Sequence, residues 1–284
     1  MGTKTTISYA DHTFSPWFGC EPVSPGCANC FARRWALNKM GVAAGGRWQA
    51  SWRYWQQPLK WEKALAEGRV WQCSCGEYWT ERQRCGAATK GLHDCGKLAA
   101  VVNRARVLTD LCDPFDDQVP EQWLARYLDL IHRTPHLDWL VLTKRPQLIR
   151  ERLLTPTGWY RATLWHVNVW PGVSAENQEW ADKRIPLLLT MPWVGPHWVS
   201  AEPLLGPIDL HLLDRPGVKW VVVGGMSGPG WRRWLCEIEW IEGIAAQCNV
   251  AGVPLWIKQD SGPRPGIQGR IPDELWEIKQ LPTT

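Results

Sequence analysis

Short apolar stretches alternate with longer amphipathic segments along most of the chain. The apolar stretches are rich in Val, Leu and Trp, a composition typical of buried strands. The expected strands are 5–9, 105–111, 138–145, 166–174, 197–204, 219–228 and 253–260. Between them, apolar residues recur at helical spacing. The expected helices are 31–40, 120–133, 146–154, 176–189 and 236–250.

This alternation predicts an α/β fold in which parallel strands are joined by crossover helices. Only the stretch 197–204 is followed by a loop rather than by a clear helix. The number of strand–helix units favours a partial or full (βα) barrel over an open sheet. Such barrels carry their reacting groups at the carboxyl ends of the strands.

Polar side chains gather at the carboxyl ends of the expected strands, and these ends are therefore the expected site. The residues are Thr109, Asp110, Thr143, Lys144, Arg145, Ser174, Glu176, Ser200, Glu202, Lys258 and Gln259. The alternative interpretation is that they form salt bridges around the barrel mouth.

Composition narrows the class of protein. The net charge of +4 is too small to indicate a nucleic-acid partner by itself. The sequence has no apolar run of about 18 residues and no secretory signal, so we expect a cytoplasmic protein without a membrane partner, in the host cytoplasm if a phage encodes it. Ten cysteines in such a protein indicate metal or redox chemistry rather than disulfides.

Three cysteines form the most specific motif. Cys20, Cys27 and Cys30 have the spacing C-x6-C-x2-C in a loop bent by proline and glycine, directly before an expected helix. Three thiolates can hold three irons of a [4Fe–4S] cluster and leave the fourth iron open. A zinc site with His12 as the fourth ligand and three unliganded thiols are the alternatives.

Several other segments, together with this motif, carry a family resemblance. They include QPLKWEK, VLTDLCDPFDDQVPEQW, NVWPGVSAENQEWADKRIPLLL, HWVSAEPLLGPIDL and AGVPLWIKQDSG. In these segments the chain resembles a bacteriophage family of three-cysteine-motif proteins related to the radical S-adenosylmethionine (SAM) superfamily. The resemblance implies a barrel of radical SAM type, with SAM bound at the open iron and a reductant such as flavodoxin as partner.

The resemblance also implies roles for individual residues by their strand positions. Phe31, Asp110, Ser174 and Glu176 are expected to bind the cofactor. Lys144, Glu202 and Lys258 are expected to be catalytic.

A Cys-rich segment interrupts the alternating pattern. Residues 66–98 are polar and glycine-rich, and we interpret them as an insertion between two parts of the barrel, 1–65 and 99–284. Its cysteines, with His93, suit a Zn²⁺ site; the predicted ligands are Cys73, Cys75, Cys85 and Cys95. A second iron–sulfur cluster and unliganded thiols are the alternatives. The remaining cysteines, Cys112, Cys236 and Cys248, are expected in the core.

The expected substrate is a nucleobase, because the resemblance points to a phage. The predicted reaction is carbon-centred modification or isomerisation, giving a hypermodified thymidine in phage DNA. The expected basic and aromatic surface for an extruded base consists of Arg33, Arg34, Arg232, Arg233, Trp35, Trp231 and Trp234. The alternatives are a non-catalytic DNA- or protein-binding module with structural metal sites, and a radical SAM enzyme acting on tRNA or a small metabolite.

Overall fold

The structure is a computed structural model that describes most of the chain. The described residues are 5–41, 45–68, 70–73, 78–80, 99–153, 167–191 and 194–282. Within 70–102, the structure describes the backbone of these residues but not their side chains.

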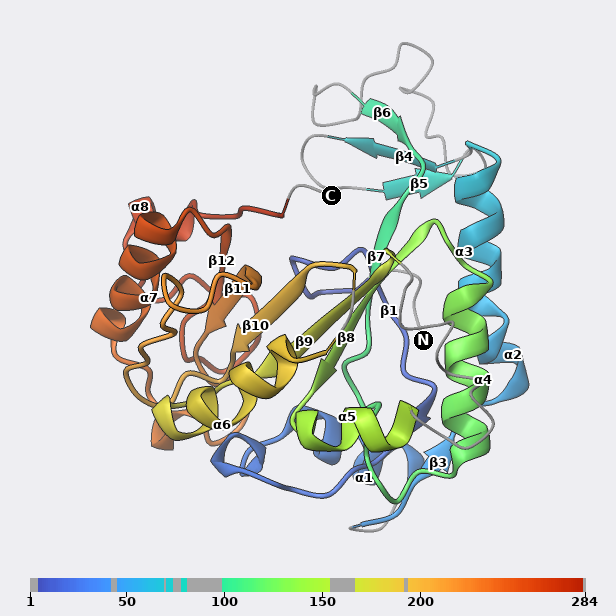
Figure 1. Ribbon diagram of the computed structural model, residues 1–284, viewed down its shortest axis with the longest axis horizontal. Coiled ribbons are helices and arrows are strands. Elements are labelled where there is room, and N and C mark those ends of the chain that lie inside the picture. Colours follow the sequence, from blue (N-terminus) through green and yellow to red (C-terminus); the bar gives the residue numbers. More distant parts are fainter. Residues whose placement is uncertain are drawn as a thin grey trace.

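Seven parallel strands form the central sheet, which curls into a half-barrel (Figure 1). They are β1 (His12–Thr13), β7 (Ala105–Leu108), β8 (Leu137–Thr143), β9 (Val169–Ser174), β10 (His197–Ala201), β11 (Val218–Gly224) and β12 (Leu255–Gln259). Their order in the sheet is their order in the chain. Each connection therefore leads to the neighbouring strand, and all carboxyl ends lie at one edge.

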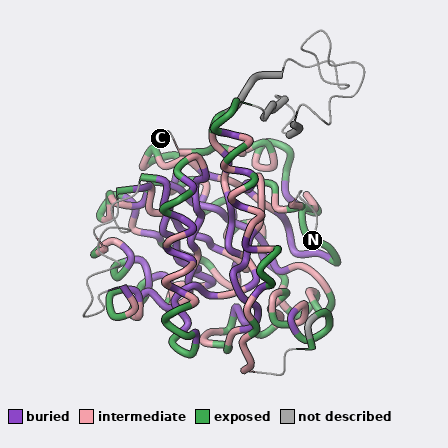
Figure 2. Tube along the Cα trace, turned by 90° about the vertical axis from the view of Figure 1, so that its right-hand side faces the viewer, coloured by how far each residue is buried: buried purple, intermediate pink, exposed green. Residues whose placement is uncertain are grey.

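Helices cover the outer face of this sheet (Figure 1). They are α1 (Phe31–Met40), α2 (Trp52–Trp55), α3 (Gln57–Ala66), α4 (Glu121–His132), α5 (Pro146–Leu153), α6 (Gln178–Leu189), α7 (Ile238–Ala251) and α8 (Asp273–Trp276). Leu124, Ile149, Ile185 and Ile244 from four of them join the main core with alternate strand residues. Figure 2 shows this buried layer through the middle of the molecule.

Two smaller sheets accompany the half-barrel. One pairs β2 (Trp17–Phe18) with β3 (Trp48–Gln49). The other is antiparallel and contains β4 (Val70–Cys73), β5 (Tyr78–Thr80) and β6 (Ala99–Val102), in the order β5-β4-β6. The expected insertion therefore contributes β4 and β5, and β6 directly after it completes their sheet.

Large aromatic residues fill the inner face of the half-barrel. Trp198 and Trp220 are fully buried with ring centroids 5.4 Å apart, and Tyr9 meets Trp220 edge-on at 5.6 Å. The indole of Trp198 donates to the carbonyl of Trp170 over 2.9 Å, which satisfies its one polar atom. These tryptophans pack the core, and together with Tyr9 they close the inside of the sheet below its carboxyl edge.

The expected alternation of strands and helices is confirmed from 105 onward, but the expected first strand is wrong. Residues 5–9 form turns, and the first strand is β1. The backbone N–H of Ile7 is bound to the Thr5 hydroxyl at 3.1 Å, and Ala10 N–H is bound to the Ile7 carbonyl at 3.1 Å. These local bonds replace strand pairing. No helix in the described part of the chain is both long and apolar enough to cross a membrane.

Gly172 tests the packing of the inner face. A Cβ at this position would lie 2.4 Å from the indole of Trp198, which cannot move aside within the buried layer. We expect Gly172→Ala to lower the free energy of unfolding by about 1–3 kcal/mol, measured by urea denaturation.

Gly243→Ala is the matched control, because Gly243 lies in α7 and a Cβ there has no atom within 4 Å. Alanine should stabilise that helix by about 0.5–1 kcal/mol. Equal effects of the two substitutions would contradict the close contact between Gly172 and Trp198.

Candidate functional site

A cavity of about 270 Å³ opens at the carboxyl edge of the sheet. Residues at or just beyond the ends of β7, β8, β9, β10, β11 and β12 line it, together with the cysteine loop and the N-terminal residues Ile7 and Tyr9. The volume is near the lower end of small-molecule sites, roughly 300 Å³. The site therefore lies where parallel βα folds place their functional groups.

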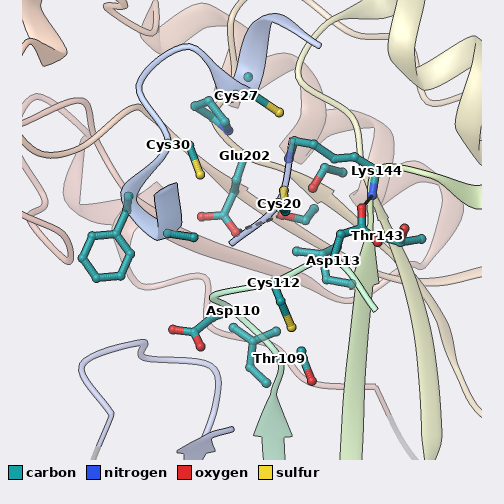
Figure 3. Close-up of a pocket in the computed structure, with 18 of the residues that line it drawn as sticks. Cys20, Cys27, Cys30, Thr109, Asp110, Cys112, Asp113, Thr143, Lys144 and Glu202 are labelled. Atoms are coloured by element: carbon teal, nitrogen blue, oxygen red, sulfur yellow. Dashed lines mark hydrogen bonds between the residues drawn. The ribbon is translucent and has the colours of Figure 1, made fainter. Parts of the chain in front are cut away.

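The three motif cysteines line this cavity as free thiols (Figure 3). Cys27 ends the short 3-10 turn Pro25–Cys27, closed by its N–H bond to the Ser24 carbonyl at 2.9 Å. Cys30 is the N-cap of α1, so its side chain lies at the positive end of the helix dipole. The loop and the helix start thus present three sulfur ligands to one space.

Thiolates from three cysteines are donors of the kind that three irons of a cubane take. Among the described residues, no group of three Cys, His, Asp or Glu side chains is placed to hold a single metal ion. His12, the alternative fourth ligand of a zinc site, does not line the cavity; its ring stacks on Trp61 at 4.1 Å.

A buried ion pair holds the Cys20 end of the loop. Arg145 follows β8 and donates to the carbonyl of Glu21 over 3.0 Å and to the carboxylate of Asp113 over 3.2 Å. Asp113 also accepts the Thr143 hydroxyl at 2.6 Å. Burial and Asp113 raise the pKa of Cys20 to about 12, while Arg145 lowers it. A metal centre would therefore displace a proton from this thiol.

A second buried ion pair lies beneath the Cys27 end. Glu176, just after β9, accepts the backbone N–H of Gly26 at 3.2 Å and pairs with Arg184 of α6 at 2.8 Å. Glu176 does not line the cavity. The structure thus gives Glu176 a contact with the cysteine loop, and its expected role in cofactor binding stays a prediction.

Polar groups of the cavity converge on Glu202. Lys258 of β12 forms an ion pair with Glu202 at 2.8 Å, and both side chains are largely shielded from water. Glu202 also accepts the hydroxyls of Ser200 at 3.1 Å and Tyr9 at 3.5 Å. This group offers an ammonium, a carboxylate and two hydroxyls to a ligand.

Lys144 differs from Lys258, because no acidic side chain among the described residues pairs with its ammonium. Its side chain extends toward the space beside the cysteines (Figure 3), so a positive charge is available there. Ser174 and Asp110 line the same cavity, and Phe31 lies at its mouth with 59% of its surface exposed.

The cavity therefore contains, beside the three cysteines, six of the seven residues that were expected to bind the cofactor or to be catalytic, with Glu176 as the exception. The six are Phe31, Asp110, Lys144, Ser174, Glu202 and Lys258. Cys75, Cys85 and Cys95 lie outside the described residues, as does the side chain of Cys73. Cys236 and Cys248 are buried as expected, whereas Cys112 lines the cavity.

Sequence reasoning missed Tyr9 and Asp113. Tyr9 was assigned to a strand that does not form. Asp113 follows the expected strand 105–111, and this place after a strand end was the one signal that it could belong to the site. Its contact with Arg145 beside the cysteine loop could not be read from the sequence.

Asp110 makes the stability of the protein depend on pH. Removal from water raises its pKa from 3.8 to about 6, against the effects of the Ser15 hydroxyl and Lys258. Between these values the folded state keeps a proton that the unfolded state releases, so stability falls as pH rises. About two pKa units correspond to about 3 kcal/mol.

We expect the unfolding free energy of the wild type, relative to Asp110→Asn, to fall by about 3 kcal/mol from pH 3 to pH 7. The loss should be complete once the pH exceeds the raised pKa of Asp110. Urea denaturation of both proteins at each pH measures this difference. A difference that stays the same across this range would show that Asp110 is not shielded from water.

Comparison with known proteins gives one match. Residues 4–265 match the family described as Protein of unknown function (DUF5131). No curated protein and no solved structure matches the chain. Because the match spans most of the 284 residues, the chain belongs to this family, DUF5131.

Proposed function

We propose that the protein is a radical SAM enzyme that holds a [4Fe–4S] cluster on Cys20, Cys27 and Cys30. The observation that carries this proposal is the position of the three thiols. They come from one short loop and face a cavity at the carboxyl edge of a parallel half-barrel. Three cysteine ligands leave one iron of a cubane available to another molecule.

With SAM on its open iron, such a cluster supplies reductive cleavage of the sulfonium, for which a reductant such as flavodoxin provides the electron. The unpaired ammonium of Lys144 is suited to binding the carboxylate of SAM. Asp110 and Ser174 offer hydrogen-bonding partners for ribose hydroxyls, and the exposed ring of Phe31 offers a stacking surface for adenine.

Lys258 and Glu202 in the same cavity would bind the substrate. Lys258 can donate to a carbonyl oxygen, and Glu202 can accept an N–H, a pairing that suits a nucleobase. The buried tryptophans beneath Tyr9 keep water from entering through the inside of the sheet. We therefore propose carbon-centred modification or isomerisation of a nucleobase, with thymidine in phage DNA as the substrate.

A basic rim beside the cavity supports a nucleic-acid substrate. Arg34 donates to the carbonyl of Pro229 over 3.1 Å, which joins the start of α1 to the loop after β11. The segments 22–40 and 225–236 contain no acidic residue. The basic rim consists of Arg33, Arg34, Arg232 and Arg233 together with Trp231, over whose ring Arg232 lies at 4.7 Å. Trp35, by contrast, packs on Phe18 at 4.9 Å.

We also propose that Cys73, Cys75, Cys85 and Cys95 bind Zn²⁺. Their side chains lie outside the part of the chain that the structure describes.

Cysteine variants test the cluster directly. After anaerobic reconstitution, we expect about four irons per chain, iron–sulfur absorbance, and 5′-deoxyadenosine on addition of SAM and reductant. Cys27→Ala should lose all three signals, because one of the three ligands is missing. Cys248→Ala is the matched control, since that buried thiol lies in α7 away from the cavity.

Unchanged iron content in Cys27→Ala would overturn the ligand assignment. A cluster without 5′-deoxyadenosine formation in the wild type would instead favour a non-catalytic binding module.

Binding to labelled single-stranded DNA tests the basic rim. We expect the double variant Arg232→Glu/Arg233→Glu to bind at least about tenfold more weakly. The slope of log K against log [salt] should become less steep by roughly 1.4 if both arginines contact phosphates. Arg133→Glu is the control, because Arg133 is an exposed arginine at the end of α4.

Fluorescence anisotropy at several salt concentrations measures both quantities. Equal affinity of all three proteins would remove the support for DNA and favour a small-metabolite substrate.

A further inference from the structure

The buried pair of Glu176 and Arg184 has no role in the cavity lining, yet it lies directly under the cysteine loop. The Glu176 side chain is fully buried, and that of Arg184 is 2% exposed. Arg184 donates through one nitrogen, Nη1, to Glu176 at 2.8 Å and to the Ser174 carbonyl at 2.9 Å. The pair thus links α6 and the end of β9 to the loop above them.

The contact between Glu176 and the loop is close. Oε1 of Glu176 accepts the N–H of Gly26, the residue before Cys27, at 3.2 Å. A Cβ at Gly26 would lie 3.1 Å from the carboxyl carbon of Glu176, so glycine permits this approach. The carboxylate therefore fixes the backbone that carries Cys27.

Arg184 is incompletely satisfied. Its Nε and Nη2 groups are buried and have no hydrogen-bond partner among the described residues. Its guanidinium lies 4.1 Å from the centroid of the Trp180 ring. Burial lowers the pKa of Arg184, and Glu176 and Cys27 both oppose this shift.

Arg145, at the other end of the loop, has more polar partners. It donates to the Asp113 carboxylate over 3.2 Å and to the Glu21 carbonyl over 3.0 Å, and it lies 3.9 Å from Asp116. Asp116 in turn accepts from Arg47 at 2.9 Å, so two arginines and two carboxylates balance one another there. Arg184 has only Glu176 as an ionic partner among the described residues, and it has two further N–H groups without an acceptor.

We propose that Glu176 and Arg184 form a positioning unit for Cys27, in which Glu176 fixes the loop and Arg184 supplies positive charge that stabilises the reduced centre. This inference rests on the proposed cluster, because it concerns the charge that three thiolates and the cluster bring to the loop. Reduction adds one negative charge, which a nearby buried cation favours. Both residues act through Cys27 and are not catalytic residues.

The midpoint potential of the cluster, measured by redox titration with electron paramagnetic resonance (EPR), tests the charge role. Glu176→Gln keeps an oxygen for Gly26 N–H but removes the negative charge, so the potential should rise. Adding Arg184→Gln to that variant removes the positive charge without leaving an unpaired carboxylate, so the potential should fall again. Arg184→Lys should stay close to wild type.

The matched control is Asp138→Asn, which removes a buried carboxylate paired with Arg104 at the other edge of the sheet. It should leave the potential unchanged. Equal potentials in Glu176→Gln and in the double variant would overturn the charge role of Arg184. A wild-type protein that assembles no reducible cluster would instead overturn the proposed function itself.

Glu176→Asp tests the positioning role separately and also serves if Glu176→Gln does not fold. The shorter side chain keeps the charge but withdraws the carboxylate from Gly26. We expect iron to be lost to a chelator faster than from the wild type. An unchanged rate of iron loss in a folded Glu176→Asp variant would overturn the positioning role.

Discussion

Parallel pairing of seven strands is the constraint on which the site depends. Parallel strands in chain order bring all their carboxyl ends to one edge, and each strand leaves its last side chains there. Lys144, Ser174 and Lys258 are at least 30 residues apart from one another in sequence, yet they line one cavity. Outer helices and inner tryptophans bury both faces, so the edge is where polar groups can be exposed together.

The cysteine loop is held against this edge by charge rather than by strand pairing. Arg145 binds the loop beside Cys20, and Glu176 binds it beside Cys27; each belongs to a buried ion pair after a neighbouring strand. Between Cys20 and Cys27, the regular structure of this loop is limited to the short 3-10 turn Pro25–Cys27. The two ion pairs supply fixed points near both cysteines, and buried pairs of this kind are costly to break.

The sequence predicted most of the fold because hydrophobic periodicity is a local property. It located β7–β12 and the helices between them, and the strand-end rule located Asp110, Lys144 and Glu202. It failed at residues 5–9, where local hydrogen bonds form turns, and it did not find that Glu176 turns under the loop toward Gly26. Such contacts depend on tertiary packing, which no periodicity encodes.

In the proposed enzyme, three cysteines leave one iron open for SAM. The EPR spectrum of the reduced, reconstituted protein tests this claim, because a ligand that binds to the open iron changes the spectrum. We predict a [4Fe–4S]⁺ signal whose g values shift when SAM is added. A signal that SAM leaves unchanged would show that no iron is open to SAM. A reconstituted protein without any such signal would show that the three cysteines hold no [4Fe–4S] cluster.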